Sequence, residues 1–424
     1  MISTLRDAWK VPEIRKKITF TMLMLFIFRL GSNIPVPYMN TAAIQEIFQS
    51  SEGGLLQFLD LMAGGTFSNF SIFATNIYPF ITASIIMQLL TIAIPRLEEL
   101  SKEGEEGRKV IGRYTRYAAV ILATIQAFGY TFGLFSNALE TTSNLQNAIV
   151  IITLVAGTSF LIWIGDLITE KGIGNGISMI IFVGIISRLP AEVLKIGQLV
   201  VAGSLSIIKV VIFGLVLLSI IAIVVALQEG ERKVNVQYAK RVVGRKMYGG
   251  QSTHIPVKVS MAGVMPVIFA SSLLALPQTV SLFFSGGGAA WIEKWLTPQG
   301  SIGIWVYSIL NVILIMFFTY FYTAIQFNTV EYAKNLQQNG GFVPGIRPGR
   351  PTSEFLNKVV SRITFVGGLS LAVIASLPII LSKLFGMNVN FGGTAIIIVV
   401  GVALETVKQL ESQMLMRHYK GFLK

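Results

Sequence analysis

The sequence contains 424 residues, of which 53% are hydrophobic and only 13% are charged, and its formal net charge is +13. A mean hydropathy of +0.67 is typical of a polytopic membrane protein and exceeds what a soluble core of this size needs. The chain has no cysteine, which excludes disulfides, thiolate metal sites and cysteine nucleophiles. Its two histidines, His254 and His418, cannot by themselves form a multi-histidine site, so no cofactor or metal is expected.

Hydropathy in a window of about 19 residues predicts ten membrane-spanning helices. They cover residues 18–34, 72–94, 114–136, 149–168, 173–189, 207–227, 260–283, 303–325, 359–384 and 393–412. An even number of spans places both termini on one side of the membrane, and 28 of the 34 Lys and Arg residues fall on that side. Cytoplasmic loops carry an excess of Lys and Arg, so the sequence predicts that the N- and C-termini are both cytoplasmic.

The stretch 53–95 begins as one apolar segment and then breaks. Leu55–Met62 is a short helical pattern, Gly64 and Gly65 interrupt it, and a polar run precedes the span that begins at Ile72. A helix of about eight to ten residues rises only about 12–15 Å, against a hydrocarbon core of about 30 Å. Irregular backbone at membrane depth is tolerated only beside protein or a water-filled cavity. The sequence therefore predicts a half-inserted helix next to a cavity.

The first of two long loops on the predicted cytoplasmic side covers residues 228–259. Val234, Val236 and Tyr238 alternate with polar residues there, which predicts a β-hairpin. The tip of this hairpin is densely basic, and a projecting basic tip suits a phosphate backbone, although it could also be a solvated loop that only fixes orientation. The basic residues of the tip are Lys240, Arg241, Arg245 and Lys246.

The second long loop, residues 326–358, contains the segment GGFVPGIRPGRPTSEF. Its prolines and glycines disfavour helix and predict a rigid, exposed shape. This loop would expose Arg347 and Arg350. A loop that only connects two spans could be much shorter. Partner binding is therefore the favoured interpretation of this loop.

Helix breakers and stiff isoleucines mark the spans that we expect around the cavity. Four prolines fall inside predicted spans: Pro79, Pro266, Pro277 and Pro378. The isoleucines beside these breaks either pack against lipid and core or form a constriction that gates by dewetting. Two halves of five spans each, 1–190 and 191–424, would have opposite orientations, as in inverted-repeat membrane proteins.

Catalytic chemistry finds little support in the sequence. The predicted spans contain few ionisable residues, and no mid-membrane Asp/Glu/His relay is evident. The sequence has no HExxH, GxSxG or Walker pattern. We therefore do not expect an enzyme.

Six stretches of the sequence resemble the SecY family, the central subunits of the bacterial protein-translocation channel. In the family's order they are SIFATNIYPFITASIIMQLL, KEGEEGRKVIGRYTRY, ITEKGIGNGIS, QSTHIPVKV with MAGVMPVIFASS, GFVPGIRPGRPT and FGGTAIIIVVGV. The resemblance covers essentially the whole chain. It implies an all-α polytopic membrane protein with ten transmembrane helices in two pseudo-symmetric five-helix halves around an hourglass pore, with a half-inserted plug helix.

The resemblance also implies a function and a set of partners. Unfolded polypeptide would cross the bacterial cytoplasmic membrane through the pore, and membrane-protein segments would leave it sideways into lipid. The SecA ATPase or a translating ribosome would supply the force, with small SecE and SecG subunits bound. The remaining expected partners are the signal peptide and nascent chain, membrane lipid and a further copy of the same subunit.

Roles for individual residues follow from the resemblance alone. The pore ring would comprise Ile77, Ile81, Ile177, Ile181, Ile268 and Ile398. The plug would be the half-inserted helix, about Gly53 to Phe70, and would include Leu55, Leu56, Phe58, Leu59, Asp60, Met62, Gly64 and Gly65. The sideways gate would lie between the second and seventh spans, with Thr82 and Gln88 facing Ser260 and its neighbours. SecA or the ribosome would dock on the basic tip of the first loop and on Arg347 and Arg350.

Two other classes of protein remain as alternatives. A secondary transporter for a small solute would also suit broken helices and inverted halves, but it needs a polar midplane site with a coupling carboxylate. A membrane-anchored RNA-binding protein would explain the basic tip but not the ten spans or the broken helix. A passive protein-conducting channel is the leading hypothesis.

Overall fold

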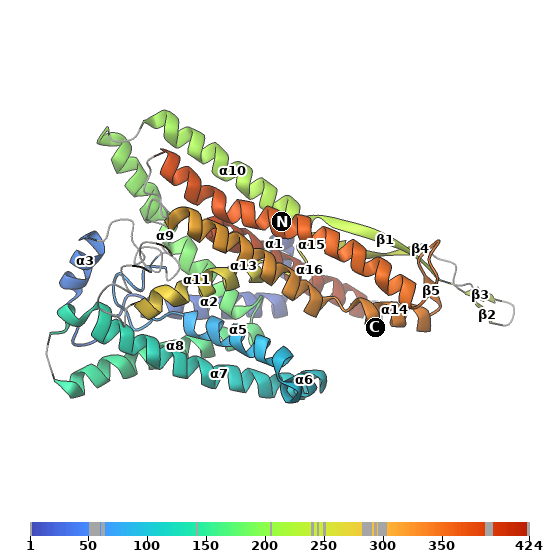
Figure 1. Cartoon of the computed structure of the whole chain (residues 1–424), viewed down its shortest axis with the longest axis horizontal. Helices are drawn as coiled ribbons and strands as arrows, with labels where there is room; N and C mark the ends of the chain where they lie inside the picture. Colours follow the sequence, from blue (N-terminus) through green and yellow to red (C-terminus); the bar gives the residue numbers. More distant parts are fainter. Residues whose placement is uncertain are drawn as a thin grey trace.

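A computed structural model gives the fold of most of the chain. The described residues are 2–50, 60, 64–140, 143–203, 206–238, 241–243, 246–248, 252–281, 291, 295, 303–385 and 393–421. Helices make up most of this part of the chain, as expected, and a small β-sheet is added to them (Figure 1). The elongated molecule carries its strands at one end, the hairpin end, and helix α3 at the other, the α3 end.

Each of the ten predicted spans overlaps one α-helix, although the bounds differ. These helices are α2 (Pro12–Gly31), α5 (Tyr78–Ala93), α7 (Glu105–Phe128), α8 (Asn144–Lys171), α9 (Gly176–Val201), α10 (Ile207–Glu229), α11 (Met265–Ser281), α13 (Gly303–Gln326), α15 (Arg350–Phe385) and α16 (Gly393–Gly421). Within the described residues, seven helices are long and apolar enough to cross a membrane, or eight if α5 and the next helix form one bent span. A multi-pass membrane protein is thus confirmed, and the number ten stays a prediction.

Shorter elements connect and cover these helices. They are α1 (Ile2–Lys10), α3 (Thr41–Ser50), α6 (Pro95–Lys102), the π-helix η1 (Gly129–Leu134), the 3-10 helix η2 (Ser136–Ala138) and α14 (Thr329–Gln338). The axis turns by 101° between α5 and α6. Ile94, between them, is extended because it precedes Pro95, and the ring of a proline disfavours helical backbone in the residue before it.

The second predicted span begins later than expected. The structure has turns rather than helix from Ile72 to Ile77, and α5 begins only at Tyr78. Asn76 has a positive φ of 52°, which a right-handed helix cannot contain. Pro79 therefore lies in the first turn of α5, where a missing N–H costs little, and not inside the helix as predicted. Pro266 likewise follows the first residue of α11, whereas Pro277 and Pro378 do lie inside helices.

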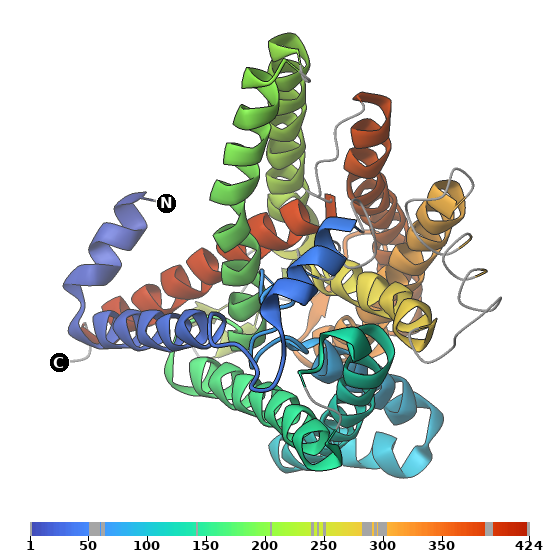
Figure 2. The same cartoon turned by 90° about the vertical axis from the view of Figure 1, so that its left-hand side faces the viewer.

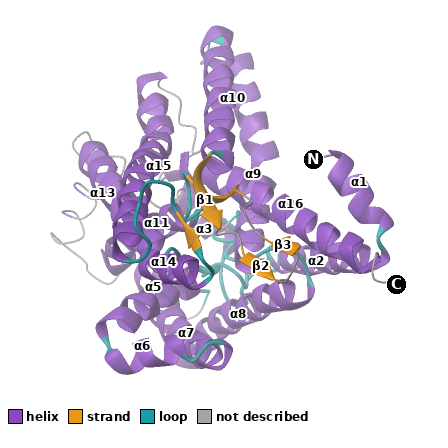
Figure 3. Cartoon of the chain, turned by 90° about the vertical axis from the view of Figure 1, so that its right-hand side faces the viewer, coloured by secondary structure: helices purple, strands orange, loops and turns teal. Residues whose placement is uncertain are grey.

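The predicted β-hairpin is confirmed. Strand β1 (Glu231–Tyr238) pairs antiparallel with β4 (Ser252–Lys258), in register Val234 with Ile255 and Val236 with Thr253. Two shorter strands, β2 (Arg241–Val243) and β3 (Lys246–Tyr248), pair beyond them. Figure 1 shows the hairpin projecting from the hairpin end of the molecule, and Figure 3 shows its strands in front of the helix ends.

The two long loops join in one compact unit, which we call the hairpin module: β1, β4, α14, β5 (Gly341–Phe342) and the first turns of α15. Strand β5 adds to the free edge of β1 and gives the order β4-β1-β5. The core of this module contains Val236, Val257 and Leu356, all with no exposed surface. The alternation noted in the sequence places the valines of β1 on this buried face.

The second loop is less irregular than predicted. Residues 329–338 form α14, and α15 begins at Arg350 with Pro351 in its first turn. Asn328 caps α14 because its side chain accepts hydrogen bonds from the amides of Val330 and Glu331. Proline is compatible with the first turn of a helix, so only the segment between β5 and Arg350 keeps the expected turns.

The main apolar core lies where the long helices converge (Figure 2). Its buried members come from both predicted halves, for example Ile77 of the first and Ile268 and Ile398 of the second. Helix α10 contributes only three buried residues to the molecule, and it exposes many large apolar side chains, among them Ile207, Leu215 and Leu218. Such a helix is stable only in an apolar solvent, as expected of a membrane span.

Candidate channel pore

Four of the predicted ring isoleucines surround one small cavity. Ile77, Ile81, Ile181 and Ile268 line it together with Asn76, Tyr78 and Ser272. The exposed fractions of the four isoleucines lie between 1% and 7%, and the cavity measures about 10 Å³. A space of this size admits about one water molecule. Branched apolar side chains from α5, α9 and α11, and from Ile77 directly before α5, therefore close the interior of the molecule at this point.

The other two predicted ring residues lie near this cavity without lining it. Ile398 of α16 is fully buried in the same apolar cluster as the four cavity isoleucines. Ile177 is half-buried and packs against that cluster from the first turn of α9. The structure thus brings all six isoleucines into one core, of which four meet at the closed point.

A second, polar cavity lies between α5, α7 with η1, and α11. It is lined by Tyr78, Thr82, Gln126, Tyr130, Ser272, Ala275 and Leu276. Thr82 was predicted to face Ser260 and its neighbours, and the serine that shares its cavity is Ser272, twelve residues further along the chain. The hydroxyl of Tyr78 and Oε1 of Gln126 are buried without a hydrogen-bond partner among the described atoms, and the cavity, about 10 Å³, admits about one water.

The remaining predicted gate residues have other partners. Gln88 on α5 accepts a hydrogen bond of 2.5 Å from the hydroxyl of Tyr322 on α13. Ser260 donates to the carbonyl oxygen of Gly263 at 3.2 Å, within the turn that precedes α11. Sequence reasoning missed Gln126, Ser272 and Tyr322. The available signal was weak: each is a polar side chain inside an otherwise apolar span.

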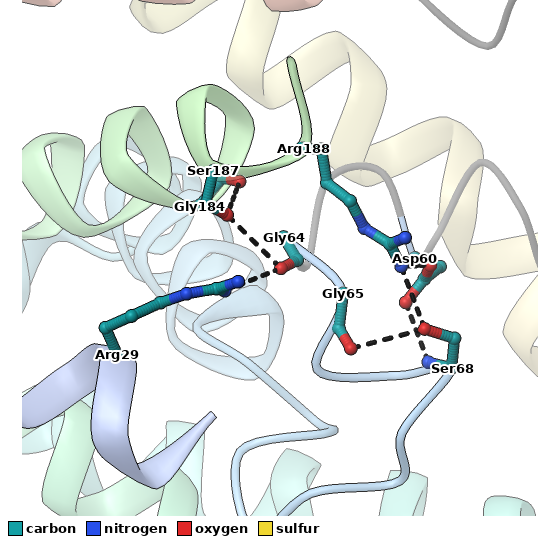
Figure 4. Close-up of polar contacts among 8 residues, drawn as sticks. All are labelled: Arg29, Asp60, Gly64, Gly65, Ser68, Gly184, Ser187 and Arg188. Carbon is teal, nitrogen blue, oxygen red and sulfur yellow. Dashed lines mark hydrogen bonds and ion pairs between the residues drawn. The ribbon is translucent and has the colours of Figure 1, made fainter. Parts of the chain in front are cut away.

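The predicted plug lies only partly in the described chain. Leu55, Leu56, Phe58, Leu59 and Met62 fall outside the described residues. Asp60, Gly64 and Gly65 are described, and Figure 4 shows the polar contacts around them.

One side chain and one backbone amide hold the carboxylate of Asp60 in place. Its carboxylate forms an ion pair with Arg188 of α9 and accepts a hydrogen bond of 2.7 Å from the backbone amide of Ser68. Arg188 also donates to the hydroxyl of Ser68 at 2.8 Å. Asp60, Arg188 and Ser68, the last through both its backbone amide and its hydroxyl, thus form a closed set of contacts, which we call the Asp60 triangle (Figure 4).

A second set of contacts holds the two glycines. The carbonyl oxygen of Gly64 accepts from Arg29 of α2 at 3.1 Å and from Ser187 of α9 at 3.4 Å. Gly64 and Gly65 have φ angles of +68° and +90°, which side chains other than glycine rarely adopt. A Cβ on Gly64 would also lie 2.5 Å from the Cα of Gly184, so the chain approaches α9 backbone to backbone.

Aromatic packing fixes the segment that follows. Phe67 and Phe70 are almost completely buried, and their rings meet Tyr130 and Phe135 edge-on at centroid distances of 5.0 and 4.8 Å. Phe73 packs against Gly31 of α2, where any side chain would collide with its ring. Irregular backbone at this depth is therefore enclosed by protein, as its position in a membrane requires.

The predicted docking residues lie at the hairpin end. Lys240 and Arg245 fall outside the described residues, whereas Arg241 and Lys246 lie on β2 and β3. Arg347 is exposed, and its backbone carbonyl accepts from the hydroxyl of Thr352 at 2.9 Å, which fixes the turn. The neighbouring Arg350 is exposed and pairs with Glu354 at 3.1 Å. The described residues contain no group of three or more potential metal ligands.

Comparison with known proteins agrees with this geometry. The SecY family model matches residues 71–407. The protein translocase subunit SecY of Halalkalibacterium halodurans is 44% identical over 437 residues, and that of Bacillus licheniformis is 44% identical over 438 residues. Both alignments cover 100% of this chain and 100% of the relative.

Solved structures share the fold. A protein-conducting channel matches with a TM-score of 0.68 at 20% identity, covering 97% of each chain. Sec61 in the canine ribosome-channel complex from the endoplasmic reticulum matches with a TM-score of 0.62 at 18% identity, again covering 97% of each chain. With a family model over most of its length and full-length relatives above 40% identity, the chain belongs to the SecY family of protein translocase subunits.

Proposed function

We propose that this chain is the pore-forming subunit of a protein-conducting channel, and that unfolded polypeptide passes through the closed point formed by Ile77, Ile81, Ile181 and Ile268. The single observation that carries this proposal is the convergence of these side chains on one small cavity. A substrate of arbitrary sequence cannot be recognised by fixed hydrogen bonds. A yielding apolar ring seals around such a chain and excludes ions by dewetting without binding it.

The same channel would release apolar segments sideways into lipid. Helices α5 and α11 pack against each other, and Thr82 and Ser272 line one small cavity between them. Each Leu, Ile, Phe or Val favours the membrane by about 0.3–0.6 kcal/mol, so a segment of some twenty such residues would leave the pore for lipid. We infer that separation of these two helices opens the sideways exit.

Force for transport would come from a partner that binds the hairpin module. The sequence has no nucleotide-binding motif, so SecA or a translating ribosome would supply it. The exposed Arg347 and Arg350 and the basic hairpin tip are the expected docking points. A ribosome partner is supported by the ribosome-bound Sec61 channel, whose fold the chain shares. SecE and SecG, and a further copy of this chain, are the other proposed subunits.

The proposed location is the bacterial cytoplasmic membrane, with the hairpin end and both termini in the cytoplasm. The support is the distribution of charge, because 28 of the 34 Lys and Arg residues lie on that side of the predicted spans. The α3 end would then face the exterior.

Crosslinking inside the pore tests the proposal. Single cysteines would be placed at Ile81 and Ile268 of this cysteine-free chain, in the assembled channel, and paired with a cysteine in a stalled secretory polypeptide. We expect disulfides at both positions only when SecA with ATP, or a ribosome, drives the polypeptide in. A control cysteine at Ile313, exposed on the outer face of α13, should not react. Reaction at neither ring position, while a cysteine in the hairpin module still reacts, would favour a solute transporter.

A further inference from the structure

One face of α9 carries both the closed point of the pore and the arginine that binds Asp60. Ile177, Ile181, Gly184 and Arg188 are spaced four, three and four residues apart, which places them in one row along the helix. Ile181 lines the central cavity, Gly184 contacts Gly64, and Arg188 pairs with Asp60. The Asp60 triangle therefore lies about two helical turns beyond the closed point, toward the α3 end.

The ion pair in this triangle is largely shielded from water. The side chain of Asp60 is 10% exposed and that of Arg188 is 25% exposed. Removing one partner of such a pair leaves an uncompensated charge in a poorly solvated place, and this costs far more than losing a surface pair. The exposed pair between Arg116 and Asp166, at 52% and 43%, is a natural comparison within the same half of the molecule.

All the polar contacts described at Asp60 and Gly64 come from the loop itself or from helices of the first half. Arg29 belongs to α2, and Ser187 and Arg188 belong to α9. The sideways exit, by contrast, separates α5 from α11, one helix from each half. Movement of the halves apart would therefore leave the contacts at Asp60 and Gly64 intact.

We propose that Arg188 is a positioning residue that latches Asp60 and keeps the idle channel closed to ions, independently of the sideways exit. This inference rests on the proposed channel function. The ion pair between Asp60 and Arg188 must be broken, in addition to any separation of α5 from α11, before Asp60 can move away from α9. Weakening the pair should open the seal along the pore axis without changing how readily apolar segments enter lipid.

Ion conductance of the idle channel complex in planar bilayers tests the latch. Asp60→Asn keeps the size of the side chain, Arg188→Gln replaces the guanidinium by a shorter amide, and each removes one charge. We expect either substitution to raise idle conductance roughly tenfold, in line with coupling energies measured for contacting pairs. The double variant should leak less than either single variant, because no unpaired charge remains. Asp166→Asn, which breaks the exposed pair, should leave conductance unchanged.

Driven translocation of a secretory polypeptide, measured on the same preparations, separates the two proposals. Normal translocation by both single variants, with idle conductance equal to that of the unmodified channel, would overturn the latch and leave the channel function standing. No translocation by the unmodified complex would overturn the channel function itself. If Arg188→Gln does not assemble, Ser68→Ala removes only one hydroxyl of the triangle, and an unchanged conductance would then count against the latch.

Discussion

At the scale of single residues, sealing and packing must be told apart, because isoleucine is suited to both. Ile81 and Ile85 lie one turn apart on α5 and are 7% and 3% exposed, but only Ile81 lines the central cavity. Replacement of either by alanine should destabilise the channel by about 2–5 kcal/mol, the usual cost of a cavity in a core. Only Ile81→Ala should also increase ion leak through the idle channel.

The measurement is conductance in planar bilayers together with thermal unfolding in detergent. An equal increase in leak for Ile81→Ala and Ile85→Ala would mean that loosened packing causes the leak and that the isoleucines form no specific seal. Ile268→Ala, in the residue of α11 that lines the same cavity, should reproduce the effect of Ile81→Ala.

Four of the six isoleucines predicted for the ring line the central cavity, but the polar groups beside them were not predicted from the sequence. Regular spacing beside helix breaks, together with the family resemblance, was enough for Ile77 and Ile81. The partner of Asp60 could not be predicted in the same way, because Arg188 lies 128 positions further along the chain. In the sequence, nothing distinguishes Arg188 from the other Lys and Arg residues on the predicted exterior side. Only the fold brings them together.

At the scale of elements, sequence periodicity could not predict two features. These are the residue at which α5 begins and the packing of the two long loops into one hairpin module. Hydropathy continues without interruption from Ile72 into the span, whereas the positive φ of Asn76 ends the irregular segment four residues later. Alternation predicted β1 correctly. It could not predict that β5, only two residues long, would join the edge of β1 from another loop.

Because the two loops share one core, a substitution that destabilises one loop should also destabilise the other. Leu356 of α15 has no exposed surface and packs in the core that holds Val236 of β1. Leu356→Ala should cost about 2–5 kcal/mol locally and should raise hydrogen exchange of the β1 and β4 amides. Val330→Ala, at a residue of α14 that is 67% exposed, should change exchange little. Protection of β1 that survives Leu356→Ala would mean that the two loops fold independently.

At the scale of the whole molecule, the proposed sideways exit requires the two proposed halves to separate, which is easiest if few specific polar contacts join them. The hydrogen bond from Tyr322 of α13 to Gln88 of α5 links the second half to the first near the sideways exit. The energy of apolar contact is non-directional and scales with the buried area, whereas a hydrogen bond is lost as a whole when its two groups separate. It is therefore a natural contribution to the free energy of opening.

Tyr322→Phe should lower the free energy of opening by about 1 kcal/mol, because it removes this bond and leaves Gln88 without its donor in the closed state. That corresponds to about a fivefold shift toward the open form. Segments of marginal hydrophobicity should then insert into lipid more often, which glycosylation-site or protease-protection assays in reconstituted membranes can measure.

Tyr320→Phe is the matched control. The hydroxyl of Tyr320 donates to the backbone carbonyl of Ser361 at 3.3 Å, and this bond lies within the second half and does not link it to the first. Equal insertion by the two variants would assign the threshold for opening to apolar packing alone, and a selective gain for Tyr322→Phe would identify this bond as part of the closed gate.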